Sequence, residues 1–133
     1  MNNFLVIGHR GASGYEPENT LRSFEKALQL GCSWIELDVH VVDDQIVVIH
    51  DDDLSRTTNG FGLVSPSSFK YLRSLAAGKG EKVQTLQEVM ELIGQRCRVN
   101  VELKGKGTAR VLSTLLRKRS SNRDQFLVSS FDH

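Results

Sequence analysis

The sequence contains few cysteines and has no excess of either charge. Cys32 and Cys97 are its only cysteines, and they form neither a CxxC pair nor a zinc-ligand spacing. This argues against a disulfide framework and a structural zinc site, so we interpret both as small buried or half-buried side chains. The 17 lysines and arginines balance 16 aspartates and glutamates. The bulk charge therefore indicates neither a nucleic acid nor an acidic membrane as a partner.

Long apolar runs are also absent. No segment approaches the roughly 20 apolar residues that a membrane-spanning helix needs. The apolar run near the N-terminus, Phe4 to Ile7, is four residues long and has no basic segment before it. The sequence therefore predicts neither a transmembrane segment nor a secretory signal. We expect one ordered domain over residues 1–133 and a cytoplasmic location.

Segments typical of strands alternate with segments typical of helices. Strands are predicted at 4–7, 34–39, 98–103 and 125–130, and two β-rich runs surround a turn within 41–49. Helices are predicted at 21–30 with Asn19 and Thr20 as caps, at 86–93 with Thr85 as cap, and at 108–119. A short helix through Phe69, Leu72 and Leu75 is also predicted, with Ser65 or Ser67 as its cap. This alternation predicts an α/β fold with mostly parallel strands. The connection from Val39 to Gln45 is too short for a crossover helix, so we expect a departure from the regular repeat there.

Acidic, basic and histidine side chains follow four of the predicted strands. His9 and Arg10 come after the first, and His50 comes after the third apolar run. Glu36 and Asp38 lie on the second strand, and Glu102 and Lys104 lie at the end of the fourth. The carboxyl ends of parallel strands meet at one edge of the sheet, where active sites form. We therefore expect these seven side chains to line one mouth.

The acids in this group suit a hard cation. Glu36 and Asp38 share one face of their strand because side chains two residues apart point the same way. Two such carboxylates repel each other unless a cation neutralises them, and Glu102 adds a third. Oxygen ligands without cysteine indicate Ca²⁺, Mg²⁺ or Mn²⁺. The alternative that spacing leaves open is a salt-bridge network with Arg10 and Lys104.

The remaining members of the group suit phosphoryl chemistry. His9 and His50 carry imidazole rings, which suit proton transfer at neutral pH, although a single histidine at a strand end is more often structural. Arg10 and Lys104 can bind an anion. Together with a metal, these residues predict a site in which one histidine acts as base and the other as acid.

At these positions the sequence resembles the glycerophosphodiester phosphodiesterase family, which belongs with the phosphatidylinositol phospholipase C-like barrels. The resemblance is carried, in the family's order, by His9-Arg10-Gly11, Pro17-Glu18-Asn19-Thr20, Glu36-Leu37-Asp38-Val39, His50-Asp51, Arg56-Thr57-Thr58-Asn59-Gly60, Thr85-Leu86-Gln87-Glu88 and Glu102-Leu103-Lys104.

The resemblance implies a TIM-type (β/α) barrel that hydrolyses glycerophosphodiesters to glycerol 3-phosphate and an alcohol. It implies His9 and His50 as the acid/base pair, and Arg10 and Lys104 as phosphate contacts. It further implies a divalent cation held by Glu36, Asp38 and Glu102. Glu18 and Asn19 are expected to brace the first loop and cap its helix.

The chain accounts for about the first five strands of such a barrel. An open barrel leaves unpaired strand edges and exposed apolar faces. We therefore expect self-association or exchange of strands between chains. Two other readings remain open: a phosphodiesterase directed at phosphoinositides or sphingomyelin, and a non-catalytic fragment or interaction module that keeps the metal site without turnover.

Overall fold

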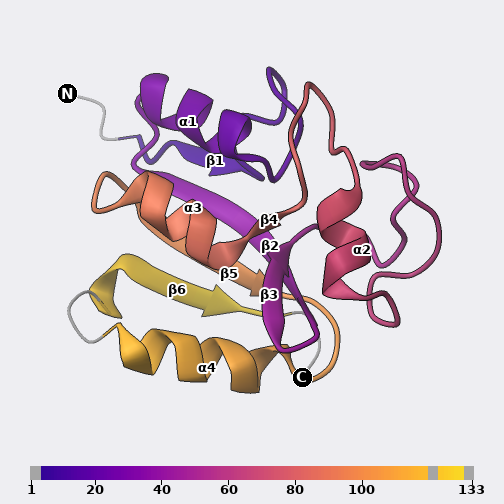
Figure 1. The fold of residues 1–133 in the computed structure, drawn as a ribbon. Helices are drawn as coiled ribbons and strands as arrows, with labels where there is room; N and C mark the ends of the chain where they lie inside the picture. Colours follow the sequence, from indigo (N-terminus) through magenta and orange to yellow (C-terminus); the bar gives the residue numbers. More distant parts are fainter. Residues whose placement is uncertain (1–3, 120–122, 131–133) are drawn as a thin grey trace.

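The computed structural model describes residues 4–119 and 123–130. The strands of this part form one six-stranded sheet in the order β4-β3-β2-β5-β6, with β1 paired to β2 (Figure 1). The strands are β1 (Ile7–His9), β2 (Trp34–Val42), β3 (Gln45–Val48), β4 (Gln84–Thr85), β5 (Arg98–Leu103) and β6 (Phe126–Ser129). The helices are α1 (Leu21–Gln29), α2 (Phe69–Ser74), α3 (Leu86–Ile93), α4 (Thr108–Lys118) and the short 3₁₀ helix η1 (Arg123–Gln125).

Four strands run parallel and are joined by helices. β1 pairs with β2, β2 with β5, and β5 with β6, all in parallel. Helices α1, α3 and α4 pack on the face of the sheet to which Ile35, Leu37 and Val39 point, and Phe24 of α1 and Val89 of α3 complete this core. Because side chains alternate along a strand, β2 presents its even-numbered residues, including both predicted metal ligands, on the opposite face.

A hairpin explains the short connection after β2. β3 runs antiparallel to β2, and the two residues between them, Asp43 and Asp44, have φ angles of 51° and 58°, as a tight hairpin turn requires. The third apolar run is thus not a parallel strand, and no crossover helix is needed. The hairpin extends beyond the end of β5 and returns, so that the backbone N–H of Ile49 donates to the carbonyl of Asp38 at 3.0 Å. This return carries His50 back to the level of the β2 carboxylates.

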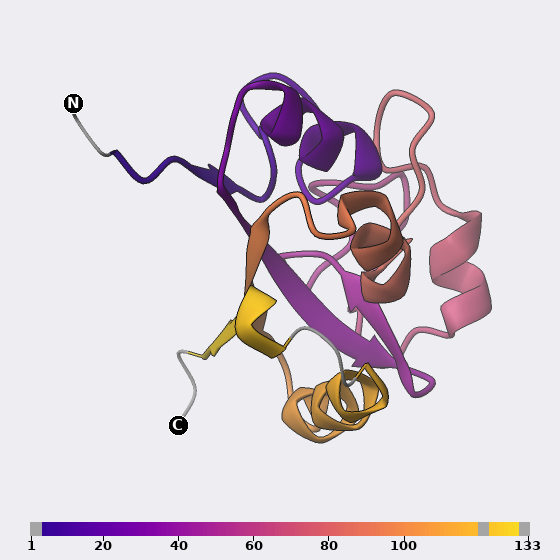
Figure 2. The ribbon, with the colours of Figure 1, turned by 90° about the vertical axis from the view of Figure 1, so that its left-hand side faces the viewer.

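A loop-rich segment follows the hairpin and forms a second, smaller core. Its apolar side chains pack against β3 and the end of β2; they are Leu54, Val64, Leu72, Leu75 and Val83, with Val42, Val47 and Ile49 from the hairpin. This segment and α2 lie on the side of the molecule away from β1 and β6 (Figure 2). It leads through β4, which pairs with β3, directly into α3.

The first strand differs from the expectation. The apolar run Phe4 to Ile7 was expected to be a covered strand, but the strand is Ile7–His9, and the four side chains of the run are between 49% and 78% exposed. Among the described strands β1 pairs only with β2, so one of its edges has no neighbour to bury the run.

Two of the predicted helix caps are confirmed, and the cap of α2 differs. Thr20 and Thr85 each accept a hydrogen bond from the backbone of the third helical residue, as expected. The cap of α2 is Ser68, and neither Ser65 nor Ser67. The hydroxyl of Ser67 instead donates to the carbonyl of Leu63 at 2.7 Å.

The two cysteines are placed as the sequence predicts. Both cysteines are free; Cys97 is buried and Cys32 half-buried. Burial raises the pKa of the Cys97 thiol to about 11, so that it stays protonated at neutral pH. Among the described residues, no helix has the length and apolar character needed to cross a membrane.

Candidate metal centre and active site

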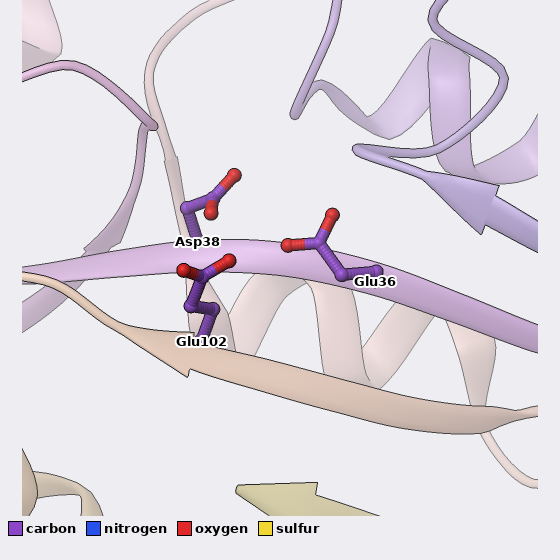
Figure 3. Close-up of side chains that lie close together, drawn as sticks. All are labelled: Glu36, Asp38 and Glu102. Atoms are coloured by element: carbon purple, nitrogen blue, oxygen red, sulfur yellow. The ribbon is translucent and has the colours of Figure 1, made fainter. Parts of the chain in front are cut away.

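Three carboxylates converge on the face of the sheet away from the helices. Glu36 and Asp38 come from β2 and Glu102 from β5, where Asp38 and Glu102 are register partners. One oxygen from each residue lies within 4.8 Å of the others, and Figure 3 shows the three groups pointing toward a common space. The period of the strand and the parallel register together place them there.

The free oxygens of this cluster fit a cation. Asp38 is fully buried and Glu36 is 7% exposed. The buried Oε1 of Glu36 and Oδ1 of Asp38 have no hydrogen-bond partner. A buried charge without a partner is unfavourable. Carboxylate oxygens of this kind are the usual ligands of hard divalent ions. The donor set is therefore suited to a divalent cation.

The raised pKa values of Glu36 and Asp38 also indicate that the cluster lacks neutralising positive charge. Burial, and then the negative charge of Asp38, raise the pKa of Glu36 from 4.5 to about 8. Burial also raises the pKa of Asp38, against the opposing effect of the hydrogen bond from Asn19. The salt-bridge alternative would leave these acids neutralised by cationic side chains. Arg10 Nε lies 3.6 Å from Asp38 and Lys104 Nζ 3.1 Å from Glu102, but these contacts do not offset the burial at β2.

The loop after β1 brings His9 and Arg10 to the cluster. His9 Nε2 lies 3.5 Å from Glu36 Oε2, and its ring is 67% exposed. The backbone N–H of Arg10 donates to the same oxygen at 3.2 Å. The loop can turn this tightly because Gly11 has a φ of +79°, and a Cβ there would lie 2.7 Å from the backbone of Ser23 on α1.

His50 is held at its ring and at its backbone. Its Nδ1 lies 2.8 Å from Asp51 Oδ1. Hydrogen bonds from Arg56 and His50 hold the pKa of Asp51 well below its usual range, so this carboxylate accepts and Nδ1 carries the proton. The carbonyl of His50 lies 3.4 Å from Nε2 of the buried His40, which shares its strand face with Asp38. With the proton on Nδ1, the other ring nitrogen of His50, Nε2, can accept a hydrogen bond or a proton.

The other four residues predicted from the sequence, His9, Arg10, His50 and Lys104, lie around these three carboxylates. His50 lies close enough to Asp38 for a positive charge on its ring to lower the Asp38 pKa, and the backbone N–H of Lys104 donates to the carbonyl of Val39 at 2.9 Å. The structure brings the set together; the roles assigned to its members remain predictions.

Some neighbours of the site were missed or misread in the sequence. Asn19 was expected to be a helix cap, but Thr20 is the cap, and the Asn19 amide donates to Asp38 Oδ2 at 3.2 Å. Asp51 and Arg56 were recognised only as parts of family motifs. Local spacing gives no signal for the contact of Asn19 with Asp38 or of Arg56 with Glu18, because these pairs are 19 and 38 residues apart in the sequence.

Comparison with known proteins identifies the family. The sequence model of the glycerophosphoryl diester phosphodiesterase family matches residues 9–133. The chain belongs to this family. It is 40% identical to a glycerophosphodiester phosphodiesterase of Caldanaerobacter subterraneus subsp. tengcongensis over 97% of the chain and 58% of that protein. It is 37% identical to a glycerophosphodiester phosphodiesterase of Bacillus subtilis over 78% of the chain and 41% of that protein.

Solved structures of the family confirm the barrel fold. A phosphodiesterase from Oleispira antarctica in complex with its product sn-glycerol-3-phosphate is 38% identical and superposes with a TM-score of 0.91 over 98% of the chain and 58% of its own length. A glycerophosphodiester phosphodiesterase from Agrobacterium tumefaciens is 38% identical, with a TM-score of 0.86, over 94% of the chain and 57% of its own length. The chain thus spans well under two thirds of the relatives that it matches.

Proposed function

We propose that the chain carries the metal-dependent catalytic site of a phosphodiester hydrolase that converts glycerophosphodiesters to glycerol 3-phosphate and an alcohol. The observation that carries the proposal is the convergence of three carboxylates, two of them with unpartnered buried oxygens, beside an arginine, a lysine and two histidines. Membership of the family and the product bound in the Oleispira antarctica relative support the substrate class.

Glu36, Asp38 and Glu102 are the proposed ligands of a divalent cation, Mg²⁺, Ca²⁺ or Mn²⁺. When bound, such an ion offsets the negative charge of the phosphate and polarises its oxygens. Arg10 and Lys104 sit beside the same carboxylates and would contact the remaining phosphate oxygens. Bringing the negatively charged phosphodiester group among three acids is unfavourable without these positive charges.

The two imidazoles would exchange protons with the reacting oxygens. In the net reaction a water oxygen bonds to phosphorus, and the ester bond between phosphorus and the alcohol oxygen breaks. One imidazole takes the proton of the water, and the other, in its protonated form, gives a proton to the leaving alcohol. His50 has a free Nε2 for such a transfer because Asp51 occupies Nδ1.

The proposal is tested by the release of glycerol 3-phosphate from glycerophosphocholine. We expect release with Mg²⁺ or Ca²⁺, none with EDTA, and a loss of at least about 100-fold in kcat for His9→Ala and for His50→Ala, as removal of an acid or base gives. Circular dichroism shows whether the variants keep the fold. Release that needs no metal, or that neither substitution lowers, would contradict the proposal.

A second candidate function is binding of the cation without turnover, because the three carboxylates can hold an ion whether or not the histidines transfer protons. Calorimetry distinguishes the two: heat of Mg²⁺ or Ca²⁺ binding without release of glycerol 3-phosphate favours the non-catalytic chain. The proposal also includes a small-molecule substrate and a cytoplasmic location. It includes no nucleic-acid partner.

A further inference from the structure

Arg56 joins two loops of the site through four hydrogen bonds. It donates from Nη1 and Nη2 to the two oxygens of Glu18, at 2.8 and 2.9 Å. It also donates from Nε and Nη2 to the two oxygens of Asp51, at 2.7 and 2.9 Å. Such paired contacts fix the orientation of both carboxylates as well as their distance. Glu18 belongs to the loop before α1 and Asp51 follows the β2–β3 hairpin, so Arg56 ties these segments together.

Each of the two carboxylates that Arg56 binds also contacts a proposed functional residue: Asp51 contacts His50, and Glu18 contacts Arg10. Asp51 holds Nδ1 of His50 at 2.8 Å. Glu18 accepts a further hydrogen bond from Nη1 of Arg10 at 3.2 Å. The carboxylate of Glu18 is therefore shared by the arginine proposed to bind phosphate and by the arginine that fixes Asp51. Burial of Glu18 favours its neutral form, but the hydrogen bonds and charges of Arg56 and Arg10 outweigh burial and lower its pKa, so Glu18 is negatively charged at neutral pH.

We propose that Glu18 is a positioning residue that orients Arg10 directly and His50 through Arg56 and Asp51, so that one ionic chain holds the anion-binding and proton-transfer groups of the site. The inference rests on the proposed function for its catalytic consequence. Single exposed ion pairs contribute little to stability. Here the side chain of Glu18 is only 15% exposed and each arginine contact is geometrically constrained, so the larger consequence is orientation.

Turnover tests the catalytic consequence. Glu18→Gln is expected to raise KM, because Arg10 loses its anchor, and to lower kcat about tenfold or more, because His50 loses its orientation. Arg56→Gln should lower kcat with a smaller change in KM, and Arg56→Lys should not restore it, because an ammonium cannot bridge two carboxylates bidentately. The double variant of Glu18→Gln and Arg56→Gln should lose less kcat than the product of the two single losses.

Glu16→Gln is the matched control. Glu16 lies in the same loop and is also paired with cations, Arg22 at 3.1 Å and Lys79 at 3.0 Å, and neither of these belongs to the site. The Glu16→Gln substitution should leave kcat and KM unchanged. Equal effects of Glu16→Gln and Glu18→Gln, or multiplicative losses in the double variant, would overturn the proposal in favour of a general effect on the loop.

A second measurement does not need turnover. In ¹⁵N NMR spectra of the neutral His50 ring, the proton should lie on Nδ1 in the wild type and exchange slowly with water. Asp51→Ala should move it largely to Nε2. Glu18→Gln should speed the exchange and lower the Nδ1–H fraction, whereas Glu16→Gln should not. An unchanged His50 ring in Glu18→Gln overturns the positioning role. If the wild type releases no glycerol 3-phosphate, the proposed function fails and this spectrum still decides whether Glu18 orients His50.

Discussion

Glu36 and Asp38 are buried side by side, and this arrangement lowers the stability of the metal-free protein at neutral pH. A carboxyl group whose pKa is higher in the folded than in the unfolded chain stabilises the fold while it is protonated. For Glu36 that contribution is complete below its ordinary pKa of 4.5 and disappears as the pH rises through about 8. A bound cation would stabilise the ionised form of these two carboxylates most strongly. Site geometry and stability are thus in conflict at these two residues, as they often are at functional sites.

Glu36→Gln tests this conflict. A glutamine resembles the protonated acid, so in EDTA the variant should melt at a higher temperature than the wild type at pH 8 and at nearly the same temperature at pH 5. Added Mg²⁺ or Ca²⁺ should raise the melting temperature of the wild type and have much less effect on the variant. Thermal unfolding followed by circular dichroism measures both, with Glu91→Gln on the exposed side of α3 as control. A variant less stable than the wild type in EDTA at pH 8 would show that the buried pair is not strained.

At the scale of single elements, local hydrogen bonding decides where helices begin. The hydroxyl of Thr85 accepts from the backbone N–H of Glu88 at 3.1 Å, and the side chain of Glu88 accepts from the backbone N–H of Thr85 at 3.0 Å. Arg73 of α2 donates to the same Glu88 oxygen at 2.7 Å, so this cap also anchors the loop-rich segment to α3. Val89 and Ile93 of α3 then pack behind β2. The start of one helix therefore supports both cores.

Thr85→Ala removes the cap without touching the site. We expect it to lower the free energy of unfolding by about 1 kcal/mol, and up to about 2 kcal/mol. Thr85→Ser keeps the acceptor and should cost much less. Urea denaturation with EDTA present measures the loss independently of metal binding. Equal stability of the alanine and serine variants would mean that the hydrogen bond to Glu88 contributes nothing.

The same elements show which features the sequence could predict. The Thr85 cap could be predicted because the capping hydrogen bonds join residues within one helical turn. The alternation of side chains along β2 was enough to predict that Glu36 and Asp38 share one face. Ser68 was missed because three neighbouring serines are equivalent in sequence, and Ser67 is engaged by Leu63. The antiparallel course of β3 and the link from Arg56 to Glu18, 38 residues away, depend on tertiary contacts. Local spacing carries no information on such contacts.

At the scale of the whole molecule, the sheet has an apolar border that the described chain does not cover. β6 pairs only with β5 among the described strands, and Leu127 and Val128 on it are half exposed. A cavity of about 380 Å³ lies between β6 and α4, lined mainly by apolar side chains that include Leu112, Leu116 and Phe126. Unpaired strand edges with apolar neighbours are sites where chains associate.

We therefore predict that the 133-residue chain associates with itself through this border. Sedimentation velocity at increasing concentration should show dimers or larger species. Leu127→Lys should reduce them, because parallel register places Leu127 on the face of the sheet that carries Asn100, and a charge there is unfavourable to bury. Leu30→Lys replaces a similarly exposed leucine just beyond α1 and should leave association unchanged. A monodisperse monomer that unfolds cooperatively would contradict the prediction, because it would show that the open border is compatible with a stable single chain.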